Sequence, residues 1–251
     1  MPVAALYDIH GNLFALQAVL EEVRGAHVDL VVIGGDVLPG PMPRETMACL
    51  MALEIPVRFI HGNGDRVVAA HLGAGDISEV PEAFREAIYW TADQLDVDQR
   101  QAITGWPSSY ELDIAGLGLT LFCHATPRND TECFTRETAE SRLVPVFGAV
   151  EASVVVCGHT HMQFDRIIAG RRVVNAGSVG MPFAAPRGAY WLLLGPGVQL
   201  CRTDYDFERA ADHIRATAYP RAEALAVRYV VNPPTEDESL RMFARSELTE
   251  Y

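Results

Sequence analysis

The fold class is decided by residues 3–36, VAALYDIHGNLFALQAVLEEVRGAHVDLVVIGGD. The apolar run at 3–7 predicts a short strand. Asn12 can then cap a helix whose leucines and valines recur at helical spacing. A second apolar run at 29–33 ends in two glycines and Asp36. A strand, a helix and a strand in this order are typical of a parallel α/β sheet.

The alternation continues through a predicted helix at 42–53 and a strand that begins at Pro56. Residues 66–105 then carry helical patterns and few strand signals, which indicates a helical insert. The second half of the chain reads instead as hairpins, with turns at 115–116, 169–170 and 195–197. We therefore predict an α/β (α+β) fold of two packed mixed β-sheets flanked by helices, a four-layer αββα sandwich.

The domain organisation follows from the same patterns. We expect a single domain over 1–251 that contains the insert 66–105 and a C-terminal helical extension at 204–251. The charged end of this extension is either a docked helix or a loose tail. We also expect the insert to form a flap over the site and to set the size of the substrate, because loops around a fixed core are where specificity is varied.

The amino-acid composition limits the classes of binding partner and the cellular compartment that we expect. The net charge is −13 and every basic residue is Arg, which argues against a broad nucleic-acid surface but not against a small phosphorylated substrate. Five cysteines without a C-x-x-C pair indicate free thiols in a reducing compartment. With no signal peptide and no apolar run near the ~18 residues of a spanning helix, we expect a cytoplasmic protein without a membrane partner. The oligomeric state cannot be predicted.

Seven polar side chains follow apolar, strand-like runs: Asp8, His10, Asp36, Asn63, His124, His159 and His161. In open α/β sheets, ligands bind beyond the carboxyl ends of the strands, so we expect these side chains to converge. Their types suit Mn, Fe or Zn better than Ca or a thiolate site. They are too many for one ion, but with Asp36 shared they fit two ions about 3.5–4 Å apart. A water between two such ions would become hydroxide near neutral pH.

Five blocks resemble the calcineurin-like metallophosphoesterase superfamily in their order and spacing: D-I-H at 8–10, G-G-D at 34–36, G-N-G-D at 62–65, His124, and G-H-T-H at 158–161. In addition, N-A-G-S-V-G at 175–180 is similar to a loop of the small bacterial and archaeal phosphodiesterase branch. The resemblance covers about residues 3–203, with 66–105 as an insert.

The resemblance implies a metal assignment. One ion would be held by Asp8, His10, Asp36 and His161, and the other by Asp36, Asn63, His124 and His159. Two divalent transition metal ions are expected, manganese first, with iron, zinc, nickel or cobalt as alternatives. The superfamily hydrolyses phosphoesters by in-line attack of the bridging hydroxide, here on a small phosphorylated substrate such as a nucleotide.

The residues that would contact substrate are less defined. Asn63 and Arg128 are expected there, although Arg128 could equally be a surface arginine. Many superfamily members carry a His directly after the Asn, and this chain has Gly64 instead. The general acid is therefore unknown, and His61 is a candidate only if its side chain faces the site.

Several functions compete. A phosphodiesterase is expected ahead of a monoesterase, with a protein phosphatase or a dinucleoside polyphosphate hydrolase as alternatives. A catalytically weak scaffold or a nucleotide-binding module on the same fold is a different class. A scaffold predicts degraded ligand positions, whereas all seven are intact here. Burying such a cluster without a compensating cation would cost several kcal/mol per charge.

Overall fold

The computed structural model describes residues 1–78 and 80–248. The first of two sheets runs in the order β10-β9-β1-β2-β3. Its strands are β1 (Val3–Leu6), β2 (Leu30–Ile33), β3 (Val57–Phe59), β9 (Ala189–Leu194) and β10 (Val198–Thr203). Strands β1, β2 and β3 are parallel, while β9 runs antiparallel to both β1 and β10. The predicted strand–helix–strand beginning is confirmed.

The second sheet runs in the order β4-β5-β6-β8-β7. Its strands are β4 (Ser109–Ile114), β5 (Gly118–Cys123), β6 (Val154–Cys157), β7 (Phe164–Ile168) and β8 (Arg171–Asn175). Strands β5, β6 and β8 are parallel, and the other two pair as antiparallel hairpin partners. All three predicted hairpins are present.

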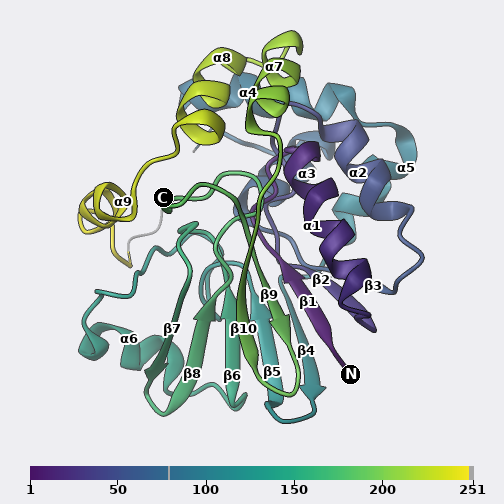
Figure 1. Cartoon of the computed structure of the whole chain (residues 1–251). Helices are drawn as coiled ribbons and strands as arrows, with labels where there is room; N and C mark the ends of the chain where they lie inside the picture. Colours follow the sequence, from purple (N-terminus) through teal and green to yellow (C-terminus); the bar gives the residue numbers. More distant parts are fainter. Residues whose placement is uncertain (79, 249–251) are drawn as a thin grey trace.

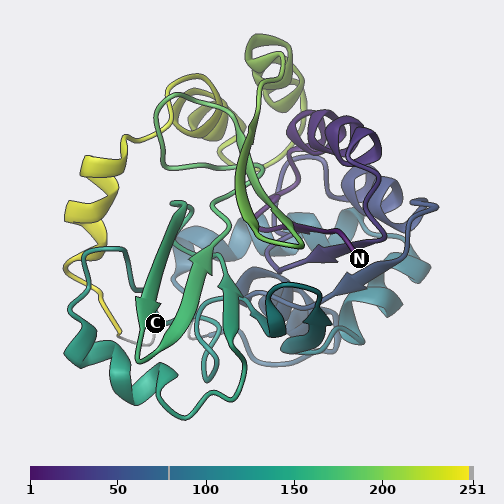
Figure 2. The same ribbon diagram turned by 60° about the horizontal axis from the view of Figure 1, so that its bottom comes forward.

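The two sheets face each other across a shared apolar layer (Figures 1 and 2). Because side chains alternate along a strand, Val3 and Ala5 point to this layer, while Leu6 points to the helices. Tyr7 continues the inner row, and its buried hydroxyl donates a hydrogen bond to the Val156 backbone oxygen of the second sheet at 3.1 Å. This arrangement confirms the predicted sandwich.

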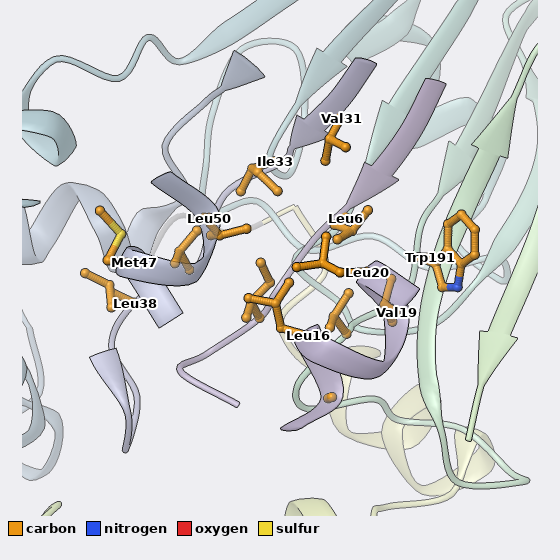
Figure 3. Packing of buried hydrophobic residues seen from close by; sticks show 14 of the residues in the cluster. Leu6, Leu16, Val19, Leu20, Val31, Ile33, Leu38, Met47, Leu50 and Trp191 are labelled. Atoms are coloured by element: carbon orange, nitrogen blue, oxygen red, sulfur yellow. The ribbon is translucent and has the colours of Figure 1, made fainter. Parts of the chain in front are cut away.

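Helices cover the outer face of the first sheet. They are α1 (Leu13–Gly25), α2 (Pro43–Met51), α3 (Asn63–Leu72), α4 (Glu82–Gln94) and α5 (Val97–Thr104). Figure 3 shows Leu16 and Leu20 of α1 packed toward Leu6 and Ile33 of the sheet. Each such side chain contributes about 1.5–3 kcal/mol when fully buried, so this layer fixes the strand ends in place. On the second sheet, α6 (Glu140–Phe147) fills the corresponding position.

The predicted insert is helical, but most of it does not form a flap over the site. Ile88, Ala92 and Ile103 belong to the same buried cluster as Met47 of α2, so α4 and α5 extend the helical layer. The helix α3 begins at Asn63, before the predicted start of the insert. Of the described residues of the insert, Ala83, Phe84 and Ala87 of α4 line the larger of the two cavities described below, and Arg66 lines the smaller.

The C-terminal extension forms α7 (Phe207–Ala216), α8 (Ala222–Leu225), a π-helical segment η1 (Ala226–Val231) and α9 (Glu236–Phe243). Helix α9 is docked through Leu240, and Glu247 pairs with Arg142 at 2.8 Å, which supports a docked end over a loose tail as far as residue 248. Across the ranges 1–78 and 80–248, no helix combines the length and the apolar character needed to cross a membrane.

Candidate metal centre

The structure brings all seven predicted ligands together at the carboxyl ends of five strands. Asp8 and His10 follow β1, Asp36 follows β2, Asn63 follows β3, His124 follows β5, and His159 and His161 follow β6. Within the described part of the chain, two groups could hold a metal ion: Asp8, His10 and His161, and Asp36, His124 and His159. In each group the candidate ligand atoms lie within 4.8 Å of one another.

The first group converges on Asp8 Oδ1. This atom lies 3.3 Å from His161 Nε2 and 3.9 Å from His10 Nε2. The two imidazole nitrogens are themselves 3.3 Å apart. Asp8 is fully buried, and its Oδ1 makes no hydrogen bond among the described residues. A buried carboxylate oxygen without a hydrogen bond is costly unless a cation compensates it.

The second group lies next to Asn63. Asp36 Oδ2 is 3.5 Å from His124 Nε2. One atom of the Asn63 amide group lies 3.2 Å from His124 Nε2 and 3.0 Å from His159 Nδ1. With the amide oxygen in that position, an oxygen and two ring nitrogens face one another, as they would around a cation.

Asp36 lies between the two groups. Its Oδ2 is 3.8 Å from His10 Nε2 of the first group and 3.5 Å from His124 Nε2 of the second. Its Oδ1 accepts a hydrogen bond from the Gly64 backbone N–H at 2.8 Å, which fixes the carboxylate plane. Asp36 Oδ2 therefore faces histidines of both groups, and Asp8 Oδ1 likewise lies 3.8 Å from His124 Nε2 of the second group.

Backbone carbonyls set the ring orientation of three histidines. His124 Nδ1 lies 3.0 Å from the Gly34 oxygen, and His161 Nδ1 lies 2.7 Å from the Met181 oxygen. His159 uses its other nitrogen, with Nε2 3.1 Å from the Thr131 oxygen. Because a carbonyl only accepts, each of these ring nitrogens carries the proton. The other nitrogen of each ring points toward the cluster, where it can bind a cation once it is deprotonated, the usual arrangement of metal-binding histidines.

The backbone is strained where the ligands lie. Five of the seven have positive φ angles: Asp8 (53°), His10 (47°), Asp36 (51°), His159 (66°) and His161 (58°). This left-handed region is unfavourable for side chains larger than Gly, and such residues concentrate at functional sites. The surrounding hydrogen bonds hold the turns, among them His10 N–H to the Asp36 oxygen at 2.9 Å.

The charges of the cluster are strongly coupled. Burial alone would lower the pKa of His124, but the Asp36 and Asp8 carboxylates outweigh it and raise that pKa to about 10. Burial opposes ionisation of Asp36, yet the neighbouring His124 holds its pKa below the usual range. Burial and His124 lower the pKa of His159 to about 4. A proton on His124 thus occupies the electrostatic place of a cation, and metal binding would displace it.

These observations fit a pair of divalent ions. The donor set consists of carboxylate oxygens, imidazole nitrogens and one amide oxygen, which suits first-row transition metals. The Asp8 oxygen without a hydrogen bond, the fixed histidine tautomers and the central Asp36 are each explained by cations at the two groups.

The packing around residue 64 explains why glycine occupies this position. A Cβ placed on this residue would lie 2.4 Å from the Leu38 backbone oxygen and 2.9 Å from Pro39 Cδ. No side chain fits there without displacing the loop after Asp36. A histidine at this position is therefore excluded by the packing of the 36–39 loop.

Asp65, for which no role was predicted, is a positioning residue. It is fully buried and accepts hydrogen bonds from the backbone N–H groups of Gly62 at 3.0 Å and Leu38 at 2.9 Å. It thereby ties the loop after β2 to the start of α3, which carry Asp36 and Asn63. Burial and the nearby Asp36 raise the pKa of Asp65 to about 8. The sequence feature that could have indicated this role is the acidic residue at position N3 of a helix, where it can accept hydrogen bonds from the backbone at the helix start.

Two cavities adjoin the cluster. The smaller, of about 260 Å³, is lined by His124, His61 and Arg128 among others. His61 thus faces the site, with its buried Nδ1 3.6 Å from Asp130 Oδ2, and burial lowers its pKa. Arg128 also lines this cavity, but its guanidinium Nε lies 3.0 Å from Glu132 Oε1. Both predicted residues are therefore close to the site, although neither is positioned as a metal ligand.

The larger cavity, of about 310 Å³, opens over both metal groups. Its floor includes His10, Asp36, His159 and His161. Its walls come from α4, through Phe84, and from the C-terminal extension, through Arg221 and Arg228. These three wall residues could not be predicted as part of the site, because no local sequence pattern links their segments to the strand ends.

Comparisons with known proteins identify a family for this fold. Residues 1–194 match the family model described as the calcineurin-like phosphoesterase superfamily domain. An uncharacterised protein of Methanocaldococcus jannaschii is 23% identical over 237 residues, which span 87% of this chain and 93% of that protein. A hypothetical protein of Pyrococcus horikoshii OT3 has a crystal structure with a TM-score of 0.79 at 21% identity, covering 93% of this chain and 99% of that one. The crystal structure of a metallophosphoesterase from Sphaerobacter thermophilus has a TM-score of 0.71 at 25% identity, covering 91% and 97%.

Proposed function

The chain belongs to the calcineurin-like phosphoesterase superfamily, and from that premise we propose that it is a dinuclear metal-dependent phosphoesterase acting on a small phosphodiester. Membership of this superfamily supports an activity as a metal-dependent phosphoester hydrolase. The two groups of candidate ligands support metal binding. The observation that carries the dinuclear proposal is Asp36, whose Oδ2 faces His10 at 3.8 Å and His124 at 3.5 Å.

The proposed ligands are those of the sequence assignment. Asp8, His10 and His161 would hold one ion, Asn63, His124 and His159 the other, and Asp36 both. Two divalent ions at these positions would supply a nucleophile at neutral pH and neutralise the phosphoryl oxygens. Manganese is the ion we propose first, because the donor set mixes carboxylate and imidazole.

The protein's own contribution is preorganisation. The carbonyls of Gly34, Thr131 and Met181 hold three imidazoles in fixed orientations, so no reorganisation is needed when the substrate binds. Asn63 and Arg128 are proposed substrate contacts, since both border the site beside His124. His61 is the proton donor to test, because it faces the same cavity.

The preference for a diester rests on the leaving group. With Gly64 closed by the loop at 36–39, the position after Asn63 carries no acid. A diester with an acidic leaving alcohol needs less protonation than an alkyl monoester. The substrate is proposed to be small, because a net charge of −13 disfavours nucleic acid and membrane surfaces. A cytoplasmic location is supported by the five free cysteines.

The test is a screen of the protein reconstituted separately with Mn, Fe, Zn, Ni and Co against phosphomonoesters, phosphodiesters and nucleotides, with metal content measured in parallel. The proposal expects two ions per chain and diesterase activity above monoesterase activity. Two bound ions with no turnover of any phosphoester would favour a scaffold or a nucleotide-binding module. One ion per chain in a fully active enzyme would overturn the dinuclear assignment.

A further inference from the structure

The larger cavity over the metal groups has a wall that the matched family domain does not supply. The family match ends at residue 194, yet Arg221, Arg228 and Tyr229 line the same cavity as His10 and Asp36. In Figure 1 the helices α7 and α8 lie beside α4 at one end of the molecule. The C-terminal extension therefore borders the same open cavity as the candidate metal ligands.

This wall is held firmly. Ala210 and Ile214 of α7 are buried in a cluster that also includes Phe14 of α1. The side chain of Asn12, the N-cap residue of α1, donates hydrogen bonds to Tyr205 Oη at 3.2 Å and to the Gly180 oxygen at 3.1 Å. The extension is thus anchored to the element that also positions Asp8 and His10.

The backbone of the wall is irregular at the residues that line the cavity. Arg221 has a φ of 66°, which is unfavourable for a residue with a side chain. Arg228 and Tyr229 lie in the π-helical segment η1, and such segments are frequent at functional sites. Three cavity-lining residues of the extension, Arg221, Arg228 and Tyr229, therefore lie in irregular backbone.

Two arginines on this wall have guanidiniums without a hydrogen-bonded partner in the described part of the chain. Neither Arg221 nor Arg228 forms a hydrogen bond or an ion pair through its guanidinium within residues 1–78 and 80–248, although Arg228 lies 5.5 Å over the Tyr229 ring. In a chain with a net charge of −13, two unpaired guanidiniums at one cavity favour an anionic ligand.

The same cavity is also lined by an exposed aromatic ring. Phe84 of α4 is 57% exposed and lines the cavity, and it contacts no other ring in the part of the chain that the structure describes. An exposed aromatic face beside a phosphate-binding site is suited to stacking against a planar group.

We infer that Arg221, Arg228 and Phe84 form a recognition wall for a nucleotide-sized phosphodiester that carries a second anionic group and an aromatic ring. The inference rests on the proposed function, because it places the scissile phosphoryl group at the metal centre. The second anionic group then contacts Arg221 and Arg228, and the ring lies against Phe84. A cavity of about 310 Å³ is of the size found for small-molecule sites.

The experiment uses three p-nitrophenyl esters with one leaving group. They are methyl p-nitrophenyl phosphate, the p-nitrophenyl ester of thymidine 5′-phosphate, and the same nucleotide ester with a 3′-phosphate. In the metal-loaded wild type, kcat/KM is expected to rise along this series. Arg221→Gln and Arg228→Gln should each reduce the advantage of the 3′-phosphorylated ester over the unphosphorylated one by about tenfold. Phe84→Ala should reduce the advantage of the thymidine ester over the methyl ester by about fivefold or more.

Matched controls remove similar groups that do not line the cavity. Arg241→Gln removes a positive charge from the same extension, and Tyr89→Ala removes an exposed aromatic ring from the same helix as Phe84. Both should keep the wild-type ratios between substrates. Ratios in the Arg221 and Arg228 variants that stay within about twofold of wild type would overturn the inference and leave the proposed function intact.

A binding measurement separates the two claims. Calorimetry with thymidine 3′,5′-bisphosphate and thymidine 5′-phosphate requires no turnover. If the wild type hydrolyses no ester with any metal, the proposed function fails, and the calorimetric comparison decides the recognition wall. Tighter binding of the bisphosphate that is lost in Arg221→Gln or Arg228→Gln supports it, and equal binding of both nucleotides by the wild type refutes it.

Discussion

Asp8 Oδ2 accepts a hydrogen bond from the backbone N–H of His159 at 2.9 Å, which joins the end of β1 in one sheet to the end of β6 in the other. The approach depends on Gly158, where a Cβ would lie 2.5 Å from the same Asp8 oxygen. Because Oδ2 is used in this way, Oδ1 is left facing His161 at 3.3 Å. The Asp8 carboxylate therefore links the two sheets and also contributes to the first ligand group.

Asp8→Asn separates these two roles. The amide oxygen of Asn can still accept from the His159 N–H, so the fold should be kept, while an NH2 group replaces the oxygen that faces His161. We expect the metal content to fall from two ions to one per chain, measured by elemental analysis after reconstitution. Asp165→Asn, which removes a carboxylate paired with Arg172 on the surface, is the control. Two ions in the Asp8 variant would show that Asp8 is not a ligand.

Asp36→Asn should be more damaging than Asn63→Ala. Asp36 faces both ligand groups, whereas Asn63 borders only the second. At saturating metal we expect kcat to fall at least about a thousandfold for Asp36→Asn and about 10–100-fold for Asn63→Ala. Comparable turnover in the two variants would argue against Asp36 as the shared ligand.

Metal removal should destabilise the fold. Asp8 and Asp36 are buried close together, and a cation compensates their repulsion. Saturation of a site at a hundred times its Kd contributes about 2.7 kcal/mol, so chelation should lower Tm by about 5–10 °C. Differential scanning calorimetry with and without chelator measures this shift, and added Mn should restore it. A Tm that does not respond to chelator or metal in a protein shown to bind metal would contradict the coupling.

Asp65→Asn tests the positioning role. Above its pKa of about 8, the Asp65 carboxylate accepts N–H donors from Gly62 and Leu38, whereas an amide NH2 in place of one oxygen would face such a donor. We expect a loss of about 2–4 kcal/mol in the free energy of unfolding and a weaker metal affinity. Because Asp65 is no ligand, excess metal should recover much of the activity. Unchanged stability in denaturant titrations would refute the role, and so would activity that no metal concentration restores.

Hydrolysis should depend steeply on the leaving group. General acid catalysis is worth about 10²–10⁴ in rate, and the loop at 36–39 leaves no room for an acid at Gly64. A series of aryl phosphodiesters of graded leaving-group pKa is expected to give a steep decrease in kcat/KM as that pKa rises. If the dependence is shallow in the wild type and steep in His61→Asn, His61 is the proton donor and the prediction is wrong.

Gly64→His is a poor test of that idea. A Cβ at Gly64 would lie 2.4 Å from the Leu38 oxygen, so the substitution displaces the loop that carries Asp36. Any loss of activity in this variant would reflect the displaced loop and would give no information about proton transfer. The sequence shows that the histidine is missing, but only the packing of the 36–39 loop shows that it has no room.

Local sequence patterns were sufficient to predict most helices and strands and the types of donor group in the site. Apolar runs, helical spacing and turn residues are local properties, so they predicted the strands, the hairpins and the seven polar residues at strand ends. Tertiary structure alone decided which groups meet, because contacts such as Asp8 with His159 join residues far apart in the chain. For the same reason, the wall that contains Arg221 and Arg228 could not be predicted. These arginines border the metal groups only because residues far apart in the chain pack together.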